Sequence, residues 1–109
     1  MHKSNLSSFT TVALCAVLSP PTLAQESGRE ALYTRSLAAS CASCHGTNGK
    51  VVEGSTVTSL AGLDTSYFVT QMNAFKAGTR NATVMHQISK GFNDAQILTL
   101  ASYFSAQKK

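Results

Sequence analysis

The pentapeptide Cys41-Ala42-Ser43-Cys44-His45 decides the fold of this chain. Its two cysteines are three positions apart, so on a helical turn both sulfur atoms face the same side. His45 follows directly and adds an imidazole nitrogen, which is a good ligand for iron. Two thiols and one imidazole are therefore placed to hold a single group.

C-x-x-C-H is the attachment pattern of a covalently bound c-type haem. We expect Cys41 and Cys44 to form thioethers to the vinyl groups of one porphyrin and His45 to ligate its iron. A structural zinc site needs four ligands, usually in Cys/His pairs, and after residue 24 only His86 remains to complete one. A thioredoxin-like dithiol needs a βαβ context, whereas the flanking sequence has a helical pattern. The pattern therefore predicts one haem c.

The first 24 residues resemble a secretory signal peptide. His2 and Lys3 form a positive start, residues 9–18 are mostly apolar, and residues 22–24 form a small-residue cleavage site. We expect cleavage near Ala24 and export to the periplasm. The apolar run is too short for a bilayer span, which needs roughly 18 residues, so no stable membrane insertion is expected.

Cleavage would leave residues 25–109 as one monohaem domain. Cys15 would leave with the signal peptide, so the mature chain would keep only the two cysteines that the haem requires. A domain of this size buries a modest fraction of its surface. We therefore expect the haem to supply part of the core and the haem-free protein to be unfolded or molten.

The charge of the chain argues against nucleic-acid binding. Nine basic and five acidic residues become eight and five once Lys3 is removed, which leaves a net charge of +3, or about +1 with two ionised haem propionates. Nucleic-acid binding would need a clustered basic stripe. Lys50, Lys76, Arg80 and Lys90 either gather near the haem edge and steer an acidic partner, or belong to an ordinary solvated surface.

Helical spacing of apolar residues predicts an all-α fold. It indicates a first helix over residues 28–40, which delivers the first haem cysteine. Residues 46–63 contain four glycines and predict a loop that covers the proximal side of the haem. Asp64 or Thr65 then caps a helix that ends at Gly78.

Two further helical segments are predicted in the C-terminal part. A short one covers residues 82–90 and stops at Gly91. Asn93 and Gln96 resemble a capping box, and the apolar spacing after them predicts an amphipathic final helix. We expect about four helices around one haem, with the two terminal helices packed together. Candidates for that contact are Tyr33, Leu37, Leu100 and Phe104.

The second axial ligand is expected to be Met85. Met72 is spaced with aromatic residues along a helix, which is more typical of core packing. His86 would instead give a bis-histidine iron, but neighbouring side chains on a helical segment diverge, so Met85 and His86 would not both face the iron. His86, Met72 and an open sixth site remain the alternatives.

The chain resembles the class I monohaem cytochromes c over nearly all of residues 25–109. Within that family it is most similar to the cytochrome subunit of flavocytochrome c sulfide dehydrogenase and, more loosely, to c4-type haem domains. The residues that carry the resemblance are Cys41-Ala42-Ser43-Cys44-His45-Gly46, Leu60-Ala61-Gly62-Leu63, Tyr67-Phe68-Val69, Gln71-Met72, Phe75-Lys76-Ala77-Gly78, Ala82-Thr83-Val84-Met85 and Leu100-Ala101-Ser102-Tyr103-Phe104.

This resemblance implies that Cys41 and Cys44 carry the haem, with His45 as the proximal and Met85 as the distal iron ligand. Related sequences usually have a proline about where Thr58 stands, and the carbonyl of that residue receives the ring N–H of the haem histidine. Any backbone carbonyl accepts such a bond, so Thr58 is expected to orient His45 from a less rigid loop.

The resemblance also implies electron transfer rather than catalysis, with the iron cycling between Fe(II) and Fe(III). One reading is a cytochrome subunit that accepts electrons from an FAD-containing, sulfide-oxidising flavoprotein. A second is a free shuttle between respiratory complexes. The rival class is a haem enzyme or gas-binding module with an open iron, for which His86 and Arg80 would supply the distal polar groups.

Overall fold

The structure, a computed structural model, describes residues 22–109, so the predicted start and apolar run of the signal peptide, with Cys15, lie outside the described residues. Within the described part there are helices and no strand, which confirms the all-α prediction. None of the helices in residues 22–109 is both long and apolar enough to cross a membrane. The elements are α1 (Leu23–Ala39), α2 (Ala42–His45), α3 (Thr65–Ala77), α4 (Met85–Ile88) and α5 (Asp94–Ser105), with 3-10 turns at Thr47–Gly49 and Ser89–Gly91.

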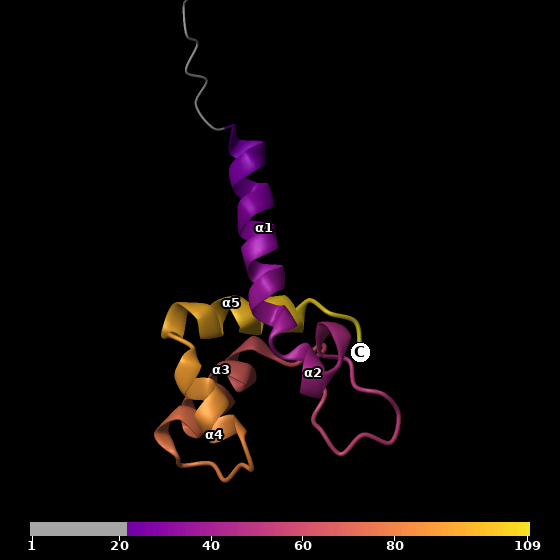
Figure 1. Ribbon diagram of the computed structural model, residues 1–109, viewed down its shortest axis with the longest axis vertical. Coiled ribbons are helices and arrows are strands. Elements are labelled where there is room, and N and C mark those ends of the chain that lie inside the picture. Colours follow the sequence, from indigo (N-terminus) through magenta and orange to yellow (C-terminus); the bar gives the residue numbers. More distant parts are fainter. Residues whose placement is uncertain (1–21) are drawn as a thin grey trace, which may run out of the picture.

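Helix α1 begins at Leu23, five residues earlier than residue 28, where the sequence predicted it to start. It rises away from the rest of the molecule (Figure 1), and its first buried residue is Ala38. The N-terminal turns of α1 pack on nothing within residues 22–109. Their sequence therefore has no apolar stripe that would mark the start of the helix. Because α1 starts at Leu23, the cleavage site predicted near Ala24 lies in the first turn of this helix.

The C-terminal end of α1 packs across α5, as predicted. Leu100 and Phe104 are completely buried in the core, and Leu37 packs against that cluster. Tyr33 differs from the expectation because its side chain is half exposed, and its hydroxyl accepts a hydrogen bond of 3.2 Å from Nε2 of Gln96. Tyr33 therefore ties the two helices together at the surface rather than in the core.

Helix α3 has the predicted ends. An oxygen of Asp64 accepts a hydrogen bond from the Tyr67 amide at 2.9 Å and another from the Ser66 hydroxyl. The Ser66 bond first, and then the Tyr67 amide, hold the pKa of the Asp64 carboxyl below its usual value of 3.8. Gly78 closes the helix in the left-handed conformation, at φ +73°. Helix α3 is therefore capped at both of its ends.

Helix α5 begins with the predicted capping box. The Asn93 side chain accepts from the Gln96 amide at 2.8 Å, and the Gln96 side chain accepts from the Asn93 amide at 3.0 Å. The predicted stripe of Ile97, Leu100, Ala101 and Phe104 is buried. Phe104 also stacks at a tilt on Phe68 of α3, with ring centroids 5.8 Å apart, so α5 joins the first and third helices.

Candidate functional site

A cavity of about 600 Å³ opens between α2, the loop that follows it, α3 and the segment that leads into α4. Cys41, Cys44 and His45 line one part of it, and Met85 lines it from a separate element. In Figure 1, α2 and α4 lie apart from one another below α5. The fold therefore brings all four residues that the sequence selected to one cavity.

The ring of His45 is held by the loop beneath it. Its Nδ1 atom lies 2.6 Å from the carbonyl oxygen of Thr58. A carbonyl oxygen only accepts, so Nδ1 carries the proton and donates it, which leaves Nε2 with a free lone pair. This is the tautomer that a metal-ligating histidine needs.

The loop that presents Thr58 is closed at its base by backbone contacts. The carbonyl oxygen of Gly49 accepts from the amides of Leu60 and Ala61 at 2.8 and 3.1 Å, and from the Ser59 hydroxyl at 2.9 Å. Three donors on one carbonyl fix the two ends of the loop side by side. The position of Thr58 therefore does not depend on a proline.

A glycine is required directly after the histidine. Gly46 has φ +79°, and a Cβ atom there would lie 2.1 Å from the carbonyl oxygen of Lys50. The backbone turns at this point so that the loop can pass beneath the helical turn that carries the two cysteines. Any side chain at this position would displace the segment that holds His45.

The two cysteines differ in their surroundings. Both are free thiols in this structure, with Cys44 exposed and Cys41 partly buried against the core. Burial raises the pKa of the Cys41 thiol, and the hydrogen bond with the Ser40 side chain opposes that shift only partly. Because both sulfur atoms border one cavity, a single planar group there is within reach of both.

Met85 lies at the first position of α4, where it lines the cavity, whereas its neighbour His86 does not. The Nδ1 atom of His86 is buried without a hydrogen-bond partner. The two side chains diverge, as their spacing predicts. Met72 also borders the cavity, but it is only 5% exposed and belongs to the core cluster with Phe68 and Leu100.

Arg80, which the sequence indicated as a possible distal group, lines the cavity in a cluster with Gln71 and Phe75 that the sequence did not indicate. The Arg80 guanidinium donates to Oε1 of Gln71, and its central carbon lies 4.6 Å from the centre of the Phe75 ring. Gly78 ends α3 and turns the chain back, which places Arg80 over the preceding helix. The glycine at position 78 predicts that the helix stops and the chain turns there. It does not predict which side chains Arg80 contacts after the turn.

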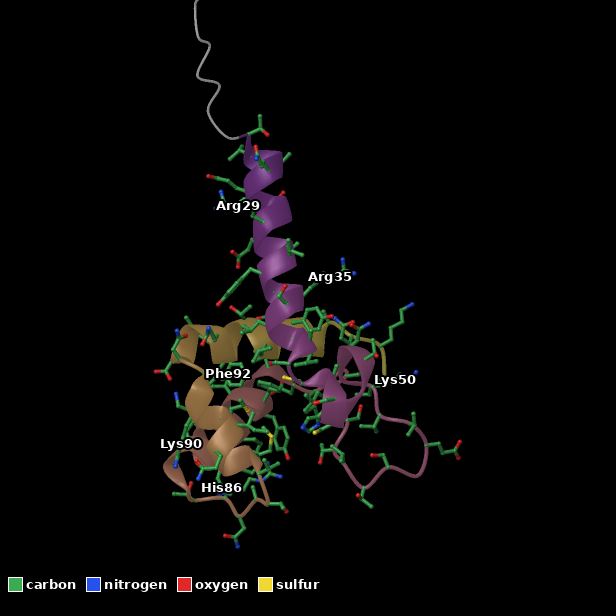
Figure 2. The ribbon with its side chains drawn as sticks, in the orientation of Figure 1. Arg29, Arg35, Lys50, His86, Lys90 and Phe92 are labelled. Atoms are coloured by element: carbon green, nitrogen blue, oxygen red, sulfur yellow. The ribbon has the colours of Figure 1, made fainter. Side chains whose placement is uncertain are left out.

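Of the four basic residues considered for a patch near the haem edge, only Arg80 lines the cavity. Lys76 binds the Phe92 carbonyl at 2.9 Å and the Asp94 carboxylate at 3.3 Å. Lys50 reaches the backbone carbonyl of Lys109, and in Figure 2 Lys50 and Lys90 lie at opposite sides of the molecule. These residues therefore form no basic ring around the cavity mouth.

The residues around the cavity fit a haem. Within residues 22–109, no three His, Cys, Asp or Glu side chains come together as a metal site made by the protein alone. One imidazole and one thioether match an iron whose other four ligands come from a porphyrin ring. Apolar side chains from α3, including Phe68, Met72 and Phe75, supply a wall suited to the face of such a ring.

Known proteins resemble this chain over most of residues 25–109. A family model described as cytochrome c matches residues 30–108. The cytochrome subunit of sulfide dehydrogenase from Chlorobaculum tepidum is 38% identical over 73 residues, which cover 67% of this chain and 64% of that protein. The thiosulfate dehydrogenase electron acceptor of Thiomonas intermedia is 39% identical over 71 residues, which cover 65% of this chain and 33% of that protein.

A third relative is shorter. Cytochrome c-554(548) of Halomonas halodenitrificans is 31% identical over 71 residues, which cover 62% of this chain and 84% of that protein. The chain spans less than two thirds of the length of the first two relatives. The family match, the haem-attachment sequence and the cavity together show that this chain belongs to the cytochrome c family, whose members carry covalently attached haem c.

Proposed function

We propose that this chain is a periplasmic electron carrier whose haem is attached at Cys41 and Cys44 and ligated by His45 and Met85. The observation that carries the proposal is the cavity that these four side chains share. The haem supplies a one-electron change between Fe(II) and Fe(III). The chain itself holds, orients and shields that group.

Each ligand is placed by its own segment. The Thr58 carbonyl fixes the His45 ring with Nε2 free, and the 2.6 Å bond opposes rotation of the ring. Met85 reaches the cavity from the start of α4. An iron held by both the His45 imidazole and the Met85 thioether would have no open coordination site, which favours electron transfer over ligand binding.

The ligand assignment is tested by the visible spectrum of the matured protein. The ferric protein is expected to show the weak far-red band of a methionine sulfur on haem iron, and Met85→Leu to abolish it. Met72→Leu is the matched control, because Met72 is a core residue and the band should persist. A band that survives Met85→Leu, or its absence from the parent, would contradict the assignment.

The rival reading, a gas-binding or catalytic haem with an open iron, is tested in the same sample. The reduced parent is expected to be inert to carbon monoxide, and Met85→Leu to bind it rapidly. Rapid binding by the parent would favour the open-iron class. Of the two side chains considered for that class, His86 does not line the cavity, whereas Arg80 lines it and donates one hydrogen bond to Gln71.

We further propose that the electron donor is the flavoprotein partner of a sulfide-oxidising dehydrogenase. The support is the likeness to a protein named as the cytochrome subunit of sulfide dehydrogenase. The likeness to a protein named as a thiosulfate dehydrogenase electron acceptor favours the second candidate, a free acceptor of electrons from sulfur-oxidising enzymes. Purification from the native periplasm separates them, since a one-to-one complex containing FAD supports the subunit and a monomer supports the free carrier.

A further inference from the structure

Asn48 and Gly49 form the only Asn-Gly pair in the sequence, shortly after the haem-attachment motif. They belong to the 3-10 turn Thr47–Gly49. Asn48 is exposed, and its backbone is left-handed, with φ 56° and ψ 23°. Glycine has no Cβ atom to keep its amide nitrogen away from a neighbouring side chain. In an unfolded chain, the nitrogen of Gly49 is therefore free to attack the side-chain amide of Asn48.

That attack is the deamidation reaction, and water is its only co-reactant. The amide nitrogen of Gly49 loses its proton to hydroxide and forms a bond to Cγ of Asn48. The bond from Cγ to Nδ2 breaks, ammonia leaves, and a five-membered succinimide remains. Water then opens this ring at either carbonyl. The products are aspartate, or isoaspartate, in which the backbone runs through the side-chain carbons and is one atom longer.

The backbone of the folded protein opposes this ring closure. At ψ 23° the nitrogen of Gly49 lies on the far side of the Cα–C bond from the Asn48 side chain, whereas the ring requires the two to be eclipsed. The Gly49 amide also donates to the Gly46 carbonyl at 2.9 Å, which retains the proton that must leave. Rotation of this peptide would move Gly49, whose Cβ position already lies 2.8 Å from side-chain carbons of Leu60 and Phe104. The ring therefore forms only when the turn opens.

The side chain of Asn48 is held from a distant helix. The hydroxyl of Tyr103 on α5 donates to Oδ1 of Asn48 at 2.7 Å, between residues 55 positions apart in the sequence. The Tyr103 ring packs edge-on against Phe104, with ring centroids 5.2 Å apart. Because the two partners are so far apart in the chain, only the folded protein makes this hydrogen bond.

We infer that Asn48 is a deamidation site that the native fold protects, with Tyr103 as the side chain that immobilises it. The fold supplies three restraints, namely the backbone angles of Asn48, the hydrogen bond of the Gly49 amide and the hydroxyl of Tyr103. An unfolded chain has none of them. The inference does not depend on the electron-transfer function, since it uses only the turn after α2 and the end of α5.

The modification would affect the iron ligand through the loop. The carbonyl of Gly49 joins the two ends of that loop, and the loop presents the Thr58 carbonyl to His45. Isoaspartate adds one backbone atom directly before Gly49, which is buried and closely surrounded. We therefore expect isoaspartate at position 48 to displace Gly49 and to weaken the closure of the loop.

The protection is tested by incubating the holoprotein at mildly alkaline pH and digesting it with trypsin. Cleavage after Arg35 and Lys50 gives a peptide of residues 36–50, in which Asn48 is the only side-chain amide, so mass spectrometry reads this site alone. A synthetic peptide of residues 46–52 is the unfolded reference. We expect Asn48 to deamidate at least about tenfold more slowly in the holoprotein than in that peptide, since the turn must open first. Equal rates would overturn the inference.

The role of Tyr103 is tested by Tyr103→Phe, which removes the hydroxyl and keeps the ring against Phe104. Deamidation should be about fivefold faster than in the parent, which is the factor that one net hydrogen bond contributes to an equilibrium. Tyr33→Phe is the matched control, because it removes a hydroxyl that bonds to Gln96 at the opposite end of α5, and it should leave the rate unchanged. A Tyr103→Phe rate equal to that of the control would contradict the role of Tyr103. A rate below that of the parent would do so as well, since the hydroxyl would then promote the attack.

The effect on the loop is tested by hydrogen exchange in the reduced holoprotein. The isoaspartyl form carries one more negative charge and is separated from the parent by ion exchange. In this form the amides of Leu60 and Ala61, which donate to the Gly49 carbonyl, should exchange at least about tenfold faster. The Phe68 amide in the first turn of α3 should be unchanged. Freshly prepared Asn48→Asp has the same charge on a backbone of normal length and should keep the parent's protection. Unchanged exchange at Leu60 and Ala61 in the isoaspartyl form would refute the coupling to the loop.

Discussion

Nδ1 of His45 and the carbonyl oxygen of Thr58 are 2.6 Å apart, across a loop whose two ends meet at Gly49. The bond makes the backbone of the loop, rather than any side chain, responsible for the tautomer of the histidine. A threonine serves this purpose because the acceptor is its carbonyl. What a proline would add at this position is stiffness, and that difference is measurable.

Thr58→Pro should keep the ligation and increase the stability. The carbonyl acceptor remains, and a proline reduces the conformational entropy of the unfolded chain, which adds about 0.5 kcal/mol to the free energy of unfolding where the backbone accommodates it. Denaturant titration of the holoprotein measures this gain. Thr58→Ala is the control and should leave the far-red band intact, since it keeps the carbonyl. A band lost in Thr58→Ala would show that the side chain matters instead.

Gly49→Ala should destabilise the protein strongly. Gly49 has φ +77°, and a Cβ atom there would lie 2.8 Å from side-chain carbons of both Leu60 and Phe104. We expect a loss of about 3 kcal/mol, from the left-handed backbone and the clash with α5 together. Gly54→Ala separates the two causes, because Gly54 has φ +81° and no atom within 4 Å of its Cβ position. Its loss should stay near 1 kcal/mol, and equal losses at both sites would rule out the clash.

The cap at Asp64 should make stability depend on pH in the acid range. Its hydrogen bonds lower the folded pKa below 3.8, so the ionised carboxylate stabilises α3 above that pH, and the contribution is lost as the pH falls through the folded pKa. Asp64→Asn keeps a capping oxygen without the titration. Its thermal midpoint should therefore fall less steeply than that of the parent between pH 5 and pH 2. Parallel curves would contradict this role.

Arg80→Gln should lower the reduction potential. A fixed positive charge beside the cavity favours the ferrous state, which carries one positive charge less. A charge about 10 Å from the iron at an effective dielectric constant of about 30 corresponds to roughly 50 mV. Arg80→Lys keeps the charge and should recover most of this difference, whereas Lys90→Gln, at an exposed position that does not line the cavity, should change little. A potential that follows Lys90 rather than Arg80 would refute a local effect.

The sequence predicts the parts of the structure that local patterns encode. The capping residues Asp64 and Asn93 and the buried stripe of α5 are where their patterns place them. The predicted start of α1 was wrong because its first turns pack on nothing within residues 22–109 and therefore need no apolar period. The interactions of Lys76 and Arg80 depend on which distant side chains the fold brings near, and no local spacing carries that information.

Removal of both attachment cysteines should leave a chain without a cooperative fold. The cavity borders Phe68 and Met72, which belong to the same buried cluster as Leu100 and Phe104. Without haem, a space of about 600 Å³ adjoins the largest part of the core, and a small domain lacks other apolar area to compensate. For Cys41→Ala/Cys44→Ala we expect residual helix by far-ultraviolet circular dichroism, no near-ultraviolet signal and no sigmoidal thermal transition. A sharp transition in that variant would show that α1, α3 and α5 hold together unaided, and that the haem adds function to a fold that exists without it.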